Sequence, residues 1–121
     1  MTDQKVDLAE MISQLKSRRE ELAELWRHPP GENLEEKERN IREIEDMMAC
    51  LNEKILILQD ILNNQQASQI IIRGLTQEEK DQMNQALAAL SRPIQRDQGF
   101  QVIMETLTTI FQGIELIATR A

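Results

Sequence analysis

Apolar residues recur at alternating intervals of three and four positions through the middle of the chain. This spacing keeps successive apolar side chains on one face of a helix. Further apolar residues flank this face at Met47, Ile57 and Ile61, which favours a helix that contacts two neighbours rather than one. The pattern therefore predicts a long helix over residues 34–73. The residues on its main face are Ile41, Ile44, Met48, Leu51, Ile55, Leu58 and Leu62.

A second helix is predicted over residues 3–28, immediately before the long one. One of its faces is apolar except for Arg19 and consists of Leu8, Ile12, Leu15, Leu22 and Trp26. Two prolines, Pro29 and Pro30, stop this helix, and Asn33 with Glu36 forms a capping-box-like pair at the start of the next. So short a link predicts an antiparallel coiled-coil hairpin, whose highly charged end protrudes as an arm.

The secondary structure of the segment after residue 62 has two interpretations. Residues 63–69 are polar and uncharged, and Ile70-Ile71-Ile72 is suited either to a short extended piece or to a last helical turn. We favour the helical turn, with Gly74 in the left-handed conformation just past its end. Thr76-Gln77-Glu78-Glu79 is a capping box, which predicts a third helix over residues 76–91.

The last helix is predicted over residues 94–120. Its apolar face consists of Phe100, Ile103, Leu107, Ile110, Ile114 and Ile117, and Met104, Phe111 and Ala118 widen it. The predicted fold class is therefore all-α: the antiparallel coiled-coil hairpin and two further helices packed into a four-helix bundle. We expect a single domain over residues 1–121.

Charge and composition narrow the functional classes. The net charge of −7 argues against nucleic-acid binding, which depends on Lys and Arg. Residues 1–60 carry fifteen acidic and nine basic residues, whereas residues 61–121 carry six and five, so the second half is the better candidate for burial. No signal peptide is visible, and polar residues interrupt the apolar stretch 98–119 too often for a transmembrane segment. We expect a soluble intracellular protein, most simply a cytoplasmic one.

Catalytic chemistry is hard to place in this sequence. The sole histidine, His28, lies in the turn that ends the first helix, where it suits the negative end of the helix dipole. The sole cysteine, Cys50, lies within a helical run and is interpreted as a structural thiol. Because no catalytic, metal-ligating or cofactor-binding motif is present, we predict no cofactor and no enzymatic activity.

The last helix carries only Glu105 and Glu115 as charges between residues 98 and 119. Either it is the most buried of the four helices, or it docks a second chain together with the end of the long helix. The predicted function is that of a non-enzymatic interaction module, as an adaptor, complex subunit or small chaperone, that binds a protein partner or self-associates. The alternative is a helical carrier of an apolar ligand. The predicted partner-binding residues are Ile57, Ile61, Val102, Met104, Ile110, Phe111 and Leu116.

Overall fold

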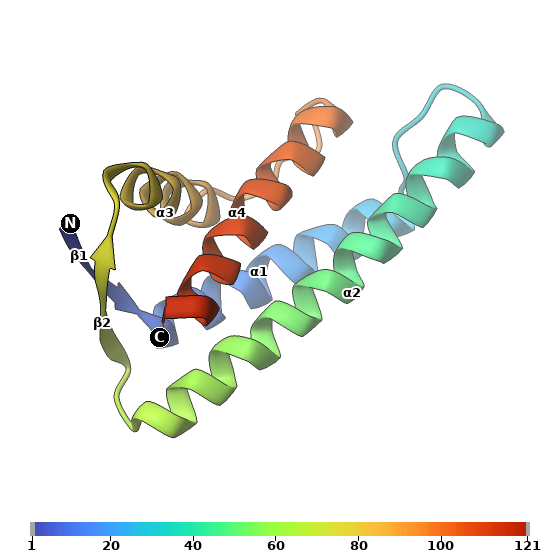
Figure 1. Cartoon of the computed structure of the whole chain (residues 1–121). Helices are drawn as coiled ribbons and strands as arrows, with labels where there is room; N and C mark the ends of the chain where they lie inside the picture. Colours follow the sequence, from blue (N-terminus) through green and yellow to red (C-terminus); the bar gives the residue numbers. More distant parts are fainter. Residues whose placement is uncertain (1, 121) are drawn as a thin grey trace.

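The computed structural model of the chain describes residues 2–120 and is mostly helical, with four helices as predicted. It also contains a two-stranded sheet that the sequence did not predict (Figure 1). In chain order, the elements are β1 (Thr2–Asp7), α1 (Leu8–Arg27), α2 (Leu34–Gln65), β2 (Gln69–Leu75), α3 (Gln77–Leu90) and α4 (Phe100–Arg120).

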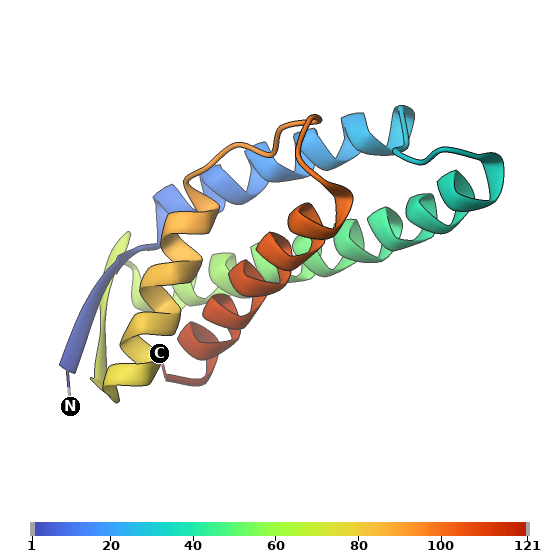
Figure 2. The same cartoon turned by 90° about the horizontal axis from the view of Figure 1, so that it is seen from above.

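The two helices nearest the N-terminus, α1 and α2, run antiparallel, and the turn that joins them extends past all other elements (Figure 2). The predicted cap at the start of α2 is confirmed, since the Asn33 side chain accepts a hydrogen bond from the Glu36 N–H at 2.8 Å. Asn40 is buried beside the turn and donates to the Pro30 carbonyl at 2.8 Å. Local hydrogen bonds therefore fix the angle at which the chain enters α2.

Two of the predicted helical segments are strands instead. Residues 3–7 belong to β1 and residues 69–73 belong to β2, which pairs with β1 in antiparallel register, Val6 opposite Ile70 and Gln4 opposite Ile72. Helix α2 ends at Gln65, where Gln66 adopts a left-handed conformation with φ of 54°. The triplet Ile70–Ile72 is therefore extended rather than helical, because a partner strand more than sixty residues away in the sequence supplies its hydrogen bonds.

The sheet contains a bulge next to Gly74. Thr2 pairs with Leu75 and Gln4 with Ile72, so Arg73 and Gly74 together face the single residue Asp3. Gly74 has a φ of +73°, and its N–H donates to the Asp3 carboxylate at 3.3 Å. The left-handed backbone predicted at this glycine is therefore present, but it forms a bulge in a strand rather than the end of a helix.

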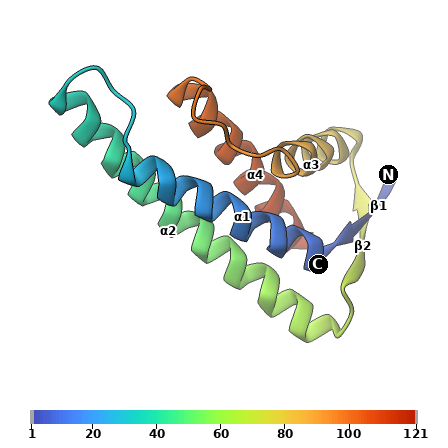
Figure 3. The ribbon, with the colours of Figure 1, turned by 180° about the vertical axis from the view of Figure 1, so that it is seen from behind.

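Helices α3 and α4 pack extensively against each other, and α4 also lies along α2 (Figures 1 and 3). The predicted capping box at the start of α3 is confirmed: the Glu79 N–H donates to Thr76 Oγ1 at 3.1 Å, and the Thr76 N–H donates to Glu79 Oε1 at 3.0 Å. Helix α4 begins at Phe100 rather than at residue 94, because residues 91–99 form the connection from α3.

The core lies between α4 and the hairpin. Of the two interpretations of the last helix, burial agrees with the structure, since eight residues of α4 are buried. The fully buried side chains that meet there include Leu8, Leu15 and Leu22 of α1, Leu51 and Leu58 of α2, and Leu107 and Ile114 of α4.

The buried face of α1 differs from the predicted one at two positions. Arg18, not Arg19, is the polar residue that points inward, and it is only 6% exposed. Near the end of the helix Leu25 is buried, whereas Trp26 is 48% exposed. Both differences amount to a rotation of the apolar face by one residue, because α1 must contact α3 as well as α2.

Candidate protein-interaction surfaces

The structure divides the predicted partner-binding residues into two groups. Met104, Ile110 and Phe111 are buried in the core that α4 shares with its neighbours. The other four remain reachable: Ile57, Ile61 and Leu116 are half-buried, and Val102 is half exposed. Those four are therefore the part of the predicted surface that a partner can touch without opening the fold.

Ile57 and Ile61 lie one helical turn apart on α2, so they share a face. Ile61 packs against the edge of the core, as does Leu116 from α4. Gln65 lies on the same face one turn after Ile61 and lines a groove beside β2. The accessible apolar strip on α2 thus leads toward that groove.

An ion pair joins α2 to α4 close to this strip. The Lys54 side chain is 6% exposed, and its ammonium donates to the carboxylate of Glu115, whose side chain is 61% exposed. Burial acts to lower the pKa of Lys54, but the hydrogen bond and charge of Glu115 outweigh it, so the pKa is raised. Lys54 therefore remains charged at neutral pH, and its pairing with Glu115 fixes the alignment of the two helices.

Cys50, one turn before Lys54, is half-buried and has no disulfide partner. Burial raises the pKa of the Cys50 thiol, and Lys54 only partly opposes this effect. A thiol with a raised pKa is a poor nucleophile at neutral pH. The geometry agrees with the structural role that the sequence predicts for this residue.

A polar cluster around Arg18 ties α1 to the connection between α3 and α4. Arg18 Nη1 donates to the carbonyl oxygens of Leu90 and Arg92, both at 2.8 Å. Its Nε atom lies 2.5 Å from Glu21 Oε1 as an ion-pair contact rather than an aligned hydrogen bond. Glu21 Oε1 also accepts from the Ile94 N–H at 2.9 Å. These contacts provide hydrogen-bond donors for the free carbonyl groups at the end of α3, so the role of the cluster is structural rather than catalytic.

The pattern of apolar and charged residues along the chain does not predict this cluster. Arg18 and Arg19 are adjacent and chemically identical, and only the contact of α1 with α3 decides which of them faces inward. Arg19 is half-buried and donates to Asn52 Oδ1 of α2 at 3.0 Å. It therefore contacts the neighbouring helix α2 from the rim of the interface.

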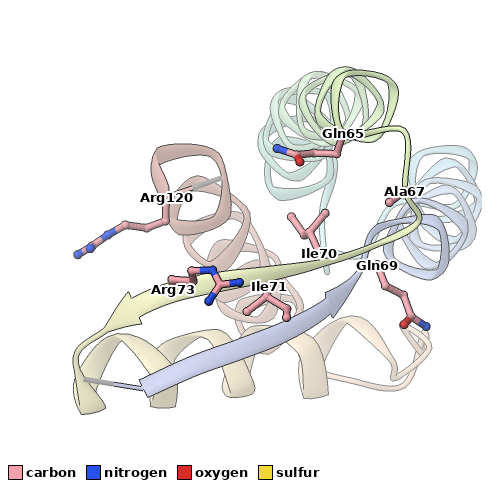
Figure 4. Close-up of a pocket in the computed structure, with 7 residues that line it drawn as sticks. All are labelled: Gln65, Ala67, Gln69, Ile70, Ile71, Arg73 and Arg120. Atoms are coloured by element: carbon pink, nitrogen blue, oxygen red, sulfur yellow. The ribbon is translucent and has the colours of Figure 1, made fainter.

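A groove of about 430 Å³ runs beside β2, between the ends of α2 and α4 (Figure 4). Within the described part of the chain, its two charged lining residues are arginines, Arg73 on β2 and Arg120 at the end of α4. Arg120 pairs with Glu79 at 2.6 Å, whereas Arg73 lies 3.9 Å from the carboxylate of Asp3. Both arginines lie toward the same end of the groove. The remaining lining residues are Gln65, Ala67, Gln69, Ile70 and Ile71.

Large apolar side chains are also exposed at other places. Trp26 and Leu34 flank the turn of the hairpin and are 48% and 72% exposed, and Leu56 of α2 is 61% exposed. Leu56 has Asn52 and Asp60 one turn away on either side, so it is an isolated apolar residue on a polar face.

Ligands for a metal ion do not gather anywhere in residues 2–120, where no group of three or more His, Cys, Asp or Glu side chains has suitable geometry. His28 is exposed at the C-cap of α1, the position that its predicted role at the helix end requires.

No protein-family model, curated protein or solved structure matches the chain. Helix α4 is long and apolar enough, by length and composition, to cross a membrane. A buried core helix meets the same criterion, and α4 contributes eight buried residues to this core.

Proposed function

We propose that this protein is a non-enzymatic interaction module, an adaptor, complex subunit or small chaperone, that binds a partner helix along α2 and α4. In this proposal the four helices act as one bundle. The accessible contact residues are Ile57 and Ile61 of α2 with Leu116 and Val102 of α4, because the other predicted residues serve the core.

The observation that carries the proposal is the half-buried apolar strip of Ile57 and Ile61 on a helix whose exposed residues are mostly charged or polar. A partner helix with apolar residues three and four positions apart would fit such a strip. Covering both side chains fully gives up to ~1.5–3 kcal/mol each relative to full exposure, and less here because they are already half-buried.

The test is the oligomeric state measured by light scattering over the micromolar concentration range, with Ile57→Glu and Leu116→Glu as variants. Self-association that both variants remove supports the surface. Leu34→Glu is the matched control, because Leu34 is a comparably large exposed residue at the far end of the hairpin. Loss of association in Leu34→Glu alone would move the interface to the hairpin turn.

A monomeric chain calls for a second measurement, since the partner is then another protein. Titration of a synthetic amphipathic helix, with a scrambled helix of equal composition as its control, should perturb the amide resonances of residues 54–61. A monomer whose resonances are unmoved by both peptides contradicts the proposal.

The alternative, a carrier of an apolar ligand, draws no support from the groove beside β2. Two arginines and two glutamines line that groove, whereas carrier sites are mainly apolar. Solvent extraction of the purified protein followed by mass spectrometry tests this alternative directly, because a carrier should yield a bound lipid.

A further inference from the structure

We infer that the groove beside β2 is a binding site for an extended acidic peptide, which adds to the sheet as a third strand. This inference goes beyond the proposed function, since it concerns a different surface and a strand rather than a helix.

The outer edge of β2 has unused hydrogen-bonding capacity. The Leu8 N–H donates to the Ser68 carbonyl at 2.7 Å, which makes these two residues a hydrogen-bonded pair. In an antiparallel ladder such pairs alternate with pairs whose main-chain groups point away from each other. With the observed register, Ile70 bonds to β1, whereas the N–H and C=O groups of Gln69 and Ile71 point to the free edge.

The groove lies along this free edge. Gln69, Ile71 and Arg73 all line it, so the open main-chain groups and the hollow coincide. Ile71 is 52% exposed and presents an apolar side chain there. An unpaired edge of this kind pairs readily with another extended chain.

The charge of the groove selects the kind of peptide. Among residues 2–120, the charged side chains that line the groove are cations, in a protein whose net charge is −7. The Arg73 side chain is 75% exposed, and its 3.9 Å contact with Asp3 leaves most of its donors available. A carboxylate on the added strand can take up these donors. The site therefore favours a strand in which acidic residues alternate with apolar ones.

A second copy of this chain fits the groove less well. Its β2 strand would bring another Arg73, and the ends of its own α2 and α4 would have to occupy the space beside the first pair of helix ends. A single strand without flanking helices avoids both conflicts.

The test uses an end-blocked hexapeptide of alternating Val and Glu, titrated into the isotope-labelled protein and followed by amide resonances. We expect shifts at Gln69, Ile71 and Arg73 and an affinity about ten-fold higher than for the matched Val–Lys peptide. Arg73→Gln should remove that preference. Equal affinities for the two peptides, or shifts confined to other elements, would overturn the inference.

Two proline variants distinguish the two edges of the sheet. Ile71→Pro removes an N–H from the free edge of β2 and leaves the bonds to β1 intact, so it should abolish binding. Lys5 is paired with Ile71 in the register, so its N–H likewise points outward, to the free edge of β1. Lys5→Pro removes that N–H and should leave peptide binding unchanged. The reverse result contradicts the site.

The peptide itself provides a test that does not depend on the folding of a variant. In a bound peptide strand, every second main-chain N–H faces β2 and the others face solvent. Methylation of the nitrogens that face β2 should abolish binding by the unaltered protein, whereas methylation of the nitrogens that face solvent should not. Ile57→Glu and Leu116→Glu should leave peptide binding unchanged, so failure of the helix-binding proposal can be told apart from failure of this one. A dimer that Ile71→Pro dissociates would make a second copy the occupant and overturn the peptide assignment.

Discussion

Gly113 of α4 and Ala86 of α3 meet in the interface between the two helices. A β-carbon placed on Gly113 would lie 2.2 Å from the β-carbon of Ala86, far below a normal contact. Both residues are buried in the interface of the most extensively packed pair of helices. The absence of a side chain at residue 113 therefore sets the distance between α3 and α4.

We predict that Gly113→Ala lowers the free energy of unfolding by about 1–3 kcal/mol, despite the higher helix propensity of Ala, because the helices must separate. Urea denaturation measures the change. Ala86→Gly combined with Gly113→Ala should recover part of the loss. Gly99→Ala is the matched control, since a β-carbon there lies 3.9 Å from its nearest neighbour in a side chain, and it should change stability little.

Replacement of Arg18 should cost far more than replacement of Arg19. Arg18→Met leaves the carbonyls of Leu90 and Arg92 and the carboxylate of Glu21 without their buried partner. We expect a loss of about 3 kcal/mol in unfolding free energy, against less than about 1 kcal/mol for Arg19→Met. Chemical denaturation of both variants measures their free energies of unfolding. Equal losses of unfolding free energy in the two variants would contradict the role given to Arg18.

The Lys54–Glu115 pair should make the protein less stable in alkaline solution. Because the pKa of Lys54 is raised in the folded state, its stabilising contribution is complete below the ordinary lysine pKa. That contribution is lost as the pH rises through the raised value.

Measurement of this loss needs a Cys50→Ala background, because the raised pKa of Cys50 also lowers stability as pH rises. In that background, Glu115→Gln should flatten the decline of unfolding free energy with pH. Glu105→Gln, an exposed acid on the same helix, should not. Identical alkaline slopes for all three proteins would mean that the pair contributes nothing.

The capping box at Thr76 should give the opposite dependence, on the acidic side. The hydrogen bond from the Thr76 N–H, helped by Arg120, lowers the pKa of Glu79. Its contribution is therefore present above the ordinary glutamate pKa and is lost as pH falls through the lowered value. Unfolding measured between neutral and acidic pH should show a shallower decline for Glu79→Gln than for the unaltered protein.

Thr76→Ala should in addition cost about 1 kcal/mol at neutral pH, which is the usual contribution of an N-cap. A Thr76→Ala variant as stable as the unaltered protein would contradict the importance of the box. Thr76→Ser keeps the hydroxyl and is the conservative control.

Two left-handed residues should respond to substitution in opposite directions. Gln66 ends α2 with a φ of 54°, where glycine is favoured, so Gln66→Gly should stabilise the protein by up to about 1 kcal/mol. Gly74 has a φ of 73° in the bulge, so Gly74→Ala should destabilise it by about 1–2 kcal/mol. Thermal melting of both variants tests these two predictions. A loss of stability in Gln66→Gly would show that the left-handed backbone of Gln66 is not strained.

The sequence by itself determined the features that depend on neighbours within a few residues. Asn33 and Thr76 cap helices because their partners lie three residues away. The alternating spacing of apolar residues likewise specified α2 and α4, since one face of a helix is defined by local geometry. Even the left-handed conformation at Gly74 was predicted, because glycine tolerates it in any element.

Tertiary structure alone decided the sheet, the orientation of Arg18 and the candidate sites, because the contacts that determine them join distant parts of the chain. The triplet Ile70–Ile72 becomes a strand only because residues 2–7 lie beside it. Arg18 rather than Arg19 faces inward because α3 ends nearby with free carbonyls. The same holds for the candidate sites: burial removed Met104, Ile110 and Phe111 from the predicted surface, and the pairing of β1 with β2 created an edge that no local pattern predicts.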